Sequence, residues 1–112
     1  MLAILGAAVT IGLGLFGAIW PSRAATLVGI SPIGGVGLSE IRATYGGLFI
    51  ALGLACLYLN SPSAYFVAGA AWIGAAVSRL PSLFIDQGCY PKAVGGAVVE
   101  LSIGLLLFTG AA

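Results

Sequence analysis

The sequence predicts an all-α integral membrane protein, a four-helix bundle with a longer, partly irregular first connector. Of the 112 residues, 61% are hydrophobic and only 6% are charged, whereas a soluble domain carries about 25% charged residues. The apolar residues lie in four runs, each near the roughly 20 residues that a helix needs to cross a bilayer core. Alternating polar and apolar strands, which would indicate an outer-membrane barrel, are absent from the sequence.

We expect one transmembrane domain, residues 1–112, with spans at about residues 2–20, 40–59, 64–85 and 93–110. The first run has no basic segment ahead of it and is longer than a signal-peptide core. We therefore expect it to be retained as a span.

The three connectors differ in length and character. Residues 60–63 form a tight polar turn, and residues 86–92 join the third and fourth spans. The connector 21–39 is longer: its first half fits a short interfacial helix, and we expect its second half, rich in proline and glycine, to be irregular. Ser39 is then a plausible N-cap of the second span.

Pro81 leaves two alternatives for the third span. The helix continues through the proline with a kink, which frees the carbonyl of Val77. Alternatively the helix stops near Leu80, because a residue before proline is disfavoured in the helical conformation.

The charged residues predict the orientation. All seven fall on one side of the bilayer when the spans alternate in direction: Arg23, Glu40, Arg42, Arg79, Asp86, Lys92 and Glu100. The positive-inside rule makes this side cytoplasmic and puts both termini on the opposite side of the membrane. Cys56 and Cys89 then lie near opposite faces, and we expect no disulfide between them.

Small residues spaced by four predict close helix packing. Such residues let helix backbones approach each other, which replaces the hydrophobic driving force that lipid does not supply. One stripe on the first span comprises Gly6, Thr10, Gly14 and Ala18, and the glycines expected at close contacts elsewhere are Gly46, Gly47, Gly74, Gly96 and Gly104. The same surfaces also suit self-association.

Two charges are predicted to pair inside the bundle. Glu100 lies about 10 Å into the fourth span, and Arg79 lies about 9 Å before the end of the third span if that helix continues through Pro81. These depths match on antiparallel neighbours, and ionised groups in a membrane normally pair. We therefore expect an Arg79–Glu100 ion pair.

Glu40 and Arg42 point about 200° apart on a helix and cannot pair with each other. We expect Arg42 to reach Glu100 or Asp86, and Glu40 to reach Arg79. The predicted cluster is Glu40, Arg42, Tyr45, Arg79, Asp86 and Glu100. It either fixes helix register, binds a polar group such as a carboxylate, phosphate or quinone carbonyl, or handles protons or ions.

Three motifs carry a family resemblance. They are Glu-Ile-Arg-Ala-x-Tyr-Gly-Gly at residues 40–47, Ser-Arg-Leu-Pro-Ser-Leu-x-x-Asp-x-Gly at residues 78–88, and a glutamate in the fourth span. In these the chain resembles the bacterial domain-of-unknown-function family DUF4345, mostly after Ser39. The resemblance implies a four-helix protein of the bacterial inner membrane with no assigned activity. Its motif residues fall on Glu40, Arg42, Tyr45, Gly46, Gly47, Arg79, Asp86, Gly88 and Glu100.

The sequence favours a non-enzymatic role. It contains no histidine, no nucleophile–base pair and no set of metal ligands, so catalysis would fall to carboxylates such as Asp86 and Glu100. The net charge of +1 gives no basic patch for nucleic acid.

We expect an accessory or structural subunit of a larger membrane complex, with membrane lipids and other subunits as partners. The alternatives are a lipid- or quinone-binding module that uses the charged cluster, and an oligomeric small transporter or channel. No cofactor is predicted beyond such a bound lipid or quinone.

Overall fold

The structure, a computed structural model, describes residues 1–86 and 91–112, which are helical with no strand in these ranges. The chain forms α1 (Leu2–Ile19), α2 (Pro21–Val28), α3 (Gly34–Arg42), a π-helical turn η1 (Ala43–Gly47), α4 (Leu48–Leu59), α5 (Pro62–Ile85) and α6 (Pro91–Phe108). The helices α3, η1 and α4 are continuous and form one helix, Gly34–Leu59, which we call the long rod.

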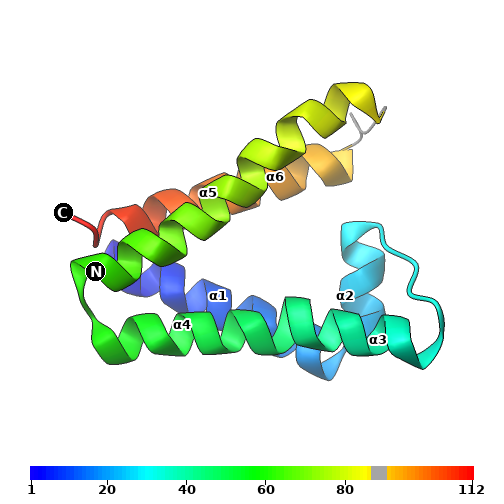
Figure 1. Cartoon of the computed structure of the whole chain (residues 1–112), viewed down its shortest axis with the longest axis horizontal. Coiled ribbons are helices and arrows are strands. Elements are labelled where there is room, and N and C mark those ends of the chain that lie inside the picture. The colour runs from blue at the N-terminus through cyan, green and yellow to red at the C-terminus, as the bar shows by residue number, and fades with distance from the viewer. Residues whose placement is uncertain (87–90) are drawn as a thin grey trace.

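The helices form two pairs that diverge like the arms of a V (Figure 1). In one arm α1 packs along η1 and α4, and in the other α5 packs along α6. The arms meet at the end that holds both termini and the α4–α5 turn, and they separate toward the end where α2 stands between them. We call these the closed end and the open end.

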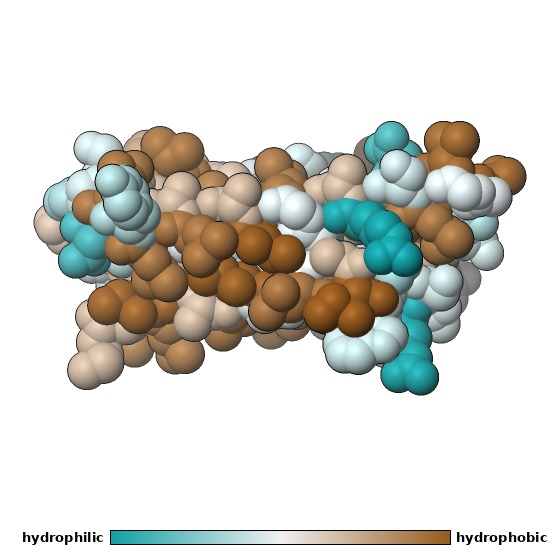
Figure 2. Space-filling view, turned by 90° about the horizontal axis from the view of Figure 1, so that it is seen from below, coloured by the Kyte–Doolittle hydropathy of each residue, from teal (hydrophilic) through white to brown (hydrophobic). Residues whose placement is uncertain are grey.

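Three helices are long and apolar enough to cross a membrane: Leu2–Ile19, Gly34–Leu59 and Pro62–Ile85. The apolar part of α6, Ala93–Phe108, is shorter. Figure 2 shows a hydrophobic surface over the middle of one face and hydrophilic residues toward both ends, as expected for a protein with a lipid-facing belt. The chain therefore has the features of a small helical membrane protein.

The turn between α4 and α5 follows from its sequence. Asn60 ends α4 in the left-handed conformation (φ 43°), which asparagine tolerates better than most residues. The Ser61 hydroxyl accepts a hydrogen bond from the Ala64 amide (3.3 Å), and Pro62 occupies the first turn of α5. A left-handed cap, a serine N-cap and an N-terminal proline reverse the chain within a few residues.

The first connector is more helical than predicted. Its first half is the expected short helix, α2, which ends at Gly29 in the left-handed conformation (φ 80°). The second half is not irregular as expected, because the long rod begins at Gly34, and Ser39 lies inside α3 and is not its N-cap. Gly37 permits this arrangement, since an added Cβ would lie 2.9 Å from the Pro32 carbonyl carbon. The lack of a side chain at Gly37 lets Pro32 pack against the first turn of α3, although glycine has a low helix propensity.

Pro81 lies inside α5, which continues to Ile85. The helix therefore continues through the proline and does not stop near Leu80. A proline within a helix removes one backbone hydrogen bond, which neighbouring groups compensate in membrane helices.

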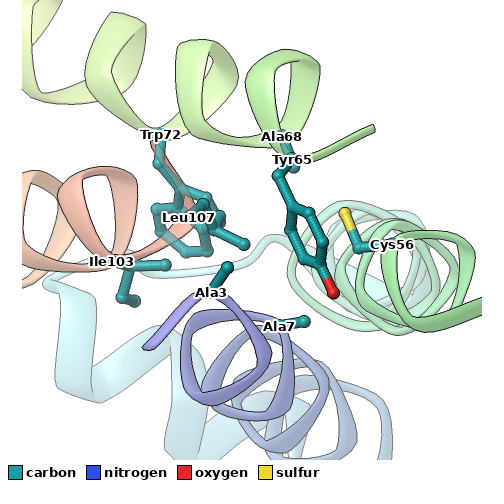
Figure 3. Packing of buried hydrophobic residues seen from close by; sticks show 8 residues of the cluster. All are labelled: Ala3, Ala7, Cys56, Tyr65, Ala68, Trp72, Ile103 and Leu107. Carbon is teal, nitrogen blue, oxygen red and sulfur yellow. The ribbon is translucent and has the colours of Figure 1, made fainter. Parts of the chain in front are cut away.

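The main core lies at the closed end. Figure 3 shows side chains of α1, α4, α5 and α6 meeting there. The buried residues are Ala3, Ala7, Cys56, Tyr65, Ala68, Trp72, Ile103 and Leu107. Small alanines on α1 make room for the rings of α5, and the Tyr65 hydroxyl donates a hydrogen bond to Asn60 Oδ1 (2.9 Å), which ties the turn to the core.

A hydrogen bond joins the two arms deeper in the fold. The indole N–H of Trp72 on α5 donates to the Thr10 hydroxyl on α1 (3.1 Å), and that hydroxyl donates to the Gly6 carbonyl (2.8 Å). Trp72 and Tyr65 are thus core residues, while Trp20 and Tyr58 are exposed.

Glycines bring the helices of each arm into backbone contact. An added Cβ on Gly14 of α1 would lie 2.7 Å from the Ile50 amide nitrogen, and one on Gly46 would lie 2.9 Å from the Ala18 nitrogen. In the other arm a Cβ on Gly104 would lie 3.2 Å from the Gly69 carbonyl oxygen. These contacts are typical of small-residue packing between membrane helices.

The packing prediction is wrong for Gly47 and Gly74. Both are exposed, and a Cβ on Gly74 would meet nothing within 4 Å. A four-residue stripe identifies a helix face but does not tell which of several stripes faces a neighbour. Three other glycines at tight contacts, Gly17, Gly53 and Gly69, were not among those predicted.

Candidate functional site

A cleft of about 410 Å³ lies between the two arms at the open end. Every helix of the fold except α3 contributes to its wall: Leu13, Phe16, Ala24, Leu27, Val28, Tyr45, Phe49, Trp72, Arg79, Gly95, Gly96, Val99 and Glu100. Its volume falls in the range of small-molecule sites, which are mostly apolar with a few placed polar groups. The α2 segment forms part of the cleft wall, and Ala24 and Ala25 hold it in place by packing with Ile41 in a second, smaller core.

Arg79 and Glu100 form the polar part of the cleft. Arg79 Nε donates to Glu100 Oε1 (2.6 Å) and Nη2 donates to Oε2 (3.2 Å), so the pair is bidentate. The side chains are 36% and 13% exposed, respectively. The ion pair predicted from matched helix depths is therefore present, and it joins α5 to α6.

Gly96 makes room for this pair. It lies one helical turn before Glu100, and a Cβ there would come 3.2 Å from Arg79 Cζ. The guanidinium thus lies over the backbone of α6, with its carboxylate partner on the same helix face. Gly96 therefore contacts a charged side chain rather than another helix backbone.

Tyr45 faces the ion pair across the cleft from the π-helical turn η1. A π-helical turn inserts an extra residue into the helical repeat, and such turns are frequent at functional sites. Here the turn coincides with the Tyr-Gly-Gly part of the motif at residues 40–47. Gly46 in this turn packs against Ala18 of α1, which fixes the turn against the neighbouring helix.

An aromatic row extends from Tyr45 across the cleft wall. The rings of Tyr45 and Phe49 meet edge to face at 6.0 Å, and those of Phe49 and Trp72 lie 4.9 Å apart at a tilted angle. The row connects the two arms along one side of the cleft. Phe49 and Trp72 were not among the predicted site residues, because an aromatic residue in a span is more often part of the packing than of a binding site.

Arg42 lies outside the cleft, and both partners predicted for it are wrong. Its guanidinium donates a hydrogen bond to the Ala18 carbonyl near the end of α1. The last carbonyls of a helix have no partner within that helix, so Arg42 caps α1. A backbone carbonyl is a partner that a search among carboxylates does not find.

The predicted network of two arginines with several carboxylates does not form among the described residues. Glu40 is exposed and makes no ion pair with Arg79, whose guanidinium binds Glu100. Asp86 is exposed and accepts a hydrogen bond from the Ser82 hydroxyl (2.6 Å) one turn earlier on α5. Of the six residues in the predicted cluster, the structure brings together Tyr45, Arg79 and Glu100.

Cys56 is buried in α4, where its thiol donates to the Ala64 carbonyl (3.7 Å). The predictions for Gly88 and Cys89 concern residues outside the described ranges. Within residues 1–86 and 91–112 there is no group of three or more side chains suited to hold a metal ion.

The family whose profile matches the chain is described as "Domain of unknown function (DUF4345)", and the match covers residues 1–111. The chain belongs to this family. The match includes the first span and the first connector, so it extends well beyond the part after Ser39 in which the resemblance was seen. Searches of curated proteins and of solved structures found no match.

Proposed function

We propose that this protein is a membrane-embedded binding module that holds one amphiphilic molecule in the cleft between its arms. The observation that carries the proposal is a charged pair that faces a tyrosine across an otherwise apolar cleft. Such a cleft suits a molecule with a polar head and an apolar body. The exposed apolar belt lets this molecule enter from the surrounding lipid.

The chemistry of the cleft favours binding over catalysis. Glu100 is held bidentately by Arg79, so its carboxylate is not a free base. The Trp72 indole N–H is engaged by Thr10. The remaining polar groups, on Arg79 and Tyr45, can each donate hydrogen bonds to a bound molecule, which suits recognition.

We place α6 in the membrane as the fourth span of the bundle, because it packs along α5. Its described apolar part has 16 residues, about 24 Å of helix. A short span is accommodated by local thinning of the bilayer or by snorkelling of flanking residues. By the positive-inside rule the open end is cytoplasmic, in the inner membrane of a bacterium. The accessory-subunit role stays a prediction, and the binding module is compatible with it.

A pair of glycine substitutions tests the proposal. Gly95 and Gly74 are both exposed on helices, and an added Cβ meets nothing within 4 Å at either position. Gly95 lines the cleft and Gly74 does not. The variant G95L should therefore fill the cleft, whereas G74L adds the same side chain outside it.

The measurement is native mass spectrometry of protein released from its own membranes in mild detergent. We expect wild type and G74L to carry a bound small molecule and G95L to lose it while remaining folded by circular dichroism. Equal retention of the molecule by G95L and G74L would reject the cleft as its site.

A further inference from the structure

We infer that the molecule in this cleft has an electrically neutral, planar head that accepts hydrogen bonds through a carbonyl oxygen, the chemistry of a quinone ring. The inference rests on the proposed function and specifies its ligand class. It separates this ligand from anionic lipid headgroups, which two arginines at membrane depth would otherwise suggest.

The charges at the open end disfavour an anionic ligand in the cleft. One of the two arginines, Arg42, is engaged with the Ala18 carbonyl away from the cleft. The other, Arg79, is neutralised in two places by Glu100. An anion bound in the cleft would lie beside the Glu100 carboxylate or would break the pair, and breaking a partly buried pair leaves the carboxylate without its partner at a cost in free energy.

The hydrogen-bonding groups of the cleft that have no protein partner among the described residues include donors on Arg79 and Tyr45. Both Glu100 oxygens already accept from Arg79, whose Nη1 and second Nη2 hydrogens stay available. Within the described part of the chain, the Tyr45 hydroxyl also has no hydrogen-bond partner, and it lines the same cleft. The cleft therefore offers donors, and a neutral acceptor such as a carbonyl oxygen complements them.

The aromatic wall of the cleft favours a planar ligand head. The aromatic row of Tyr45, Phe49 and Trp72 forms one wall of the cleft. Rings prefer offset or edge-to-face contact with other rings, which adds to the gain from apolar burial. A planar head therefore gains contacts in this cleft that a flexible acyl chain does not.

The volume of the cleft fits a substituted ring. An engineered cavity of about 150 Å³ holds a benzene molecule, and this cleft measures about 410 Å³. It has room for a substituted ring and the first part of an alkyl tail. The rest of a longer tail would extend into lipid between the arms.

Trp72 provides a reporter inside the cleft. The chain has two tryptophans, and Trp20 lies outside the cleft wall. In a W20F background, tryptophan fluorescence therefore reports on Trp72 alone. The experiment titrates a decyl-benzoquinone, which quenches tryptophan, into protein in nanodiscs of neutral phospholipid. The affinity for decyl phosphate is then measured by its displacement of the bound quinone.

We expect saturable quenching of Trp72, with the neutral quinone binding at least 10-fold more tightly than decyl phosphate. The variant E100Q keeps the shape of the side chain but leaves the Arg79 charge uncompensated. It should raise the affinity for decyl phosphate about 10-fold or more and change quinone affinity less than threefold. Y45F, which removes one donor and keeps the ring, should weaken quinone binding several-fold and leave decyl phosphate unchanged.

Each contrary result has a distinct meaning. If decyl phosphate binds wild type as tightly as the quinone, or E100Q leaves the selectivity unchanged, the inference about a neutral head is wrong although the cleft binds ligands. If E100Q does not fold, unchanged quinone affinity in Y45F overturns the inference instead. If wild type and G95L are quenched alike without saturation, the binding function itself is rejected.

Discussion

The closed and open ends of the molecule are built from the same four long helical segments but differ in what holds them together. At the closed end, alanines and glycines of α1 admit Tyr65, Trp72 and Leu107 into a dense apolar core. At the open end the arms separate (Figure 1), and a charged pair, a tyrosine and a short helix surround a cleft. Polar groups inside a membrane protein are costly and mark functional sites.

We expect the two ends to have separable roles. Small residues at the closed end and along α1 and α4 determine the stability of the fold. Under the proposed function, the Arg79–Glu100 pair and Tyr45 determine what the cleft binds. Substitutions along α1 should therefore change the free energy of unfolding most, and substitutions in the cleft should change ligand occupancy.

The largest loss of stability is expected when the contact between α1 and α4 is broken. In G14L the new side chain would collide with backbone atoms of Ile50 and Gly46. Overpacking costs 1–3 kcal/mol and occasionally more, and a rigid backbone leaves little room to adjust, so we expect a loss of about 3 kcal/mol. The matched control is G12L on the same helix, where an added Cβ meets nothing within 4 Å. Thermal unfolding in detergent measures both, and equal melting temperatures would contradict the packing.

A smaller loss is expected when Arg79 is removed from the cleft. R79A leaves the partly buried Glu100 carboxylate without its partner. Full burial would make this cost 3–5 kcal/mol, and because Arg79 is about one-third exposed we expect about 2 kcal/mol. The double variant R79A/E100A should be more stable than R79A, as measured in a double-mutant cycle. Additive losses would show that the two side chains act independently.

The next largest loss of stability is expected when the hydrogen bond between Thr10 and Trp72, which links the two arms, is removed. T10V leaves the Trp72 indole N–H without its acceptor. An unsatisfied buried donor costs 1–3 kcal/mol, and we expect about 1.5 kcal/mol of lost stability. T44V, at an exposed position in η1, is the control and should unfold like wild type. In the W20F background, a shift in Trp72 emission should appear for T10V and not for T44V.

The smallest effect concerns the cap of α1. R42A removes the hydrogen bond to the Ala18 carbonyl, which should cost about 1 kcal/mol. R23A removes an arginine at an exposed position on α2 and should change stability by less than about 0.5 kcal/mol. If R42A and R23A have the same unfolding free energy, Arg42 does not cap α1.

Sequence reasoning located the ion pair because depth along two antiparallel helices depends only on residue count and helical rise. Arg79 and Glu100 lie at matching depths, and charges in a membrane need partners. The tight α4–α5 turn followed from Asn60, Ser61 and Pro62 for the same reason: its determinants are local. Spacing and local chemistry are therefore the parts of this fold that one sequence predicts.

Features set by tertiary contact were missed. Arg42 binds a backbone carbonyl of another helix. The start of the long rod at Gly34 was also missed, because proline and glycine in this stretch predict irregular structure. The exposed Gly47 and the buried Gly46 are adjacent in one motif, and only the neighbouring helix distinguishes them. The cleft itself follows from the divergence of the arms, which no local pattern reports.

The two arginines give the most direct test of the account. R42A and R79A each remove one guanidinium from the open end of the molecule, but only Arg79 lines the cleft. Native mass spectrometry of both variants from native membranes should show the bound molecule retained by R42A and lost by R79A, with both proteins folded. Retention by R79A, or equal loss from both variants, would contradict the assignment of the cleft as the binding site.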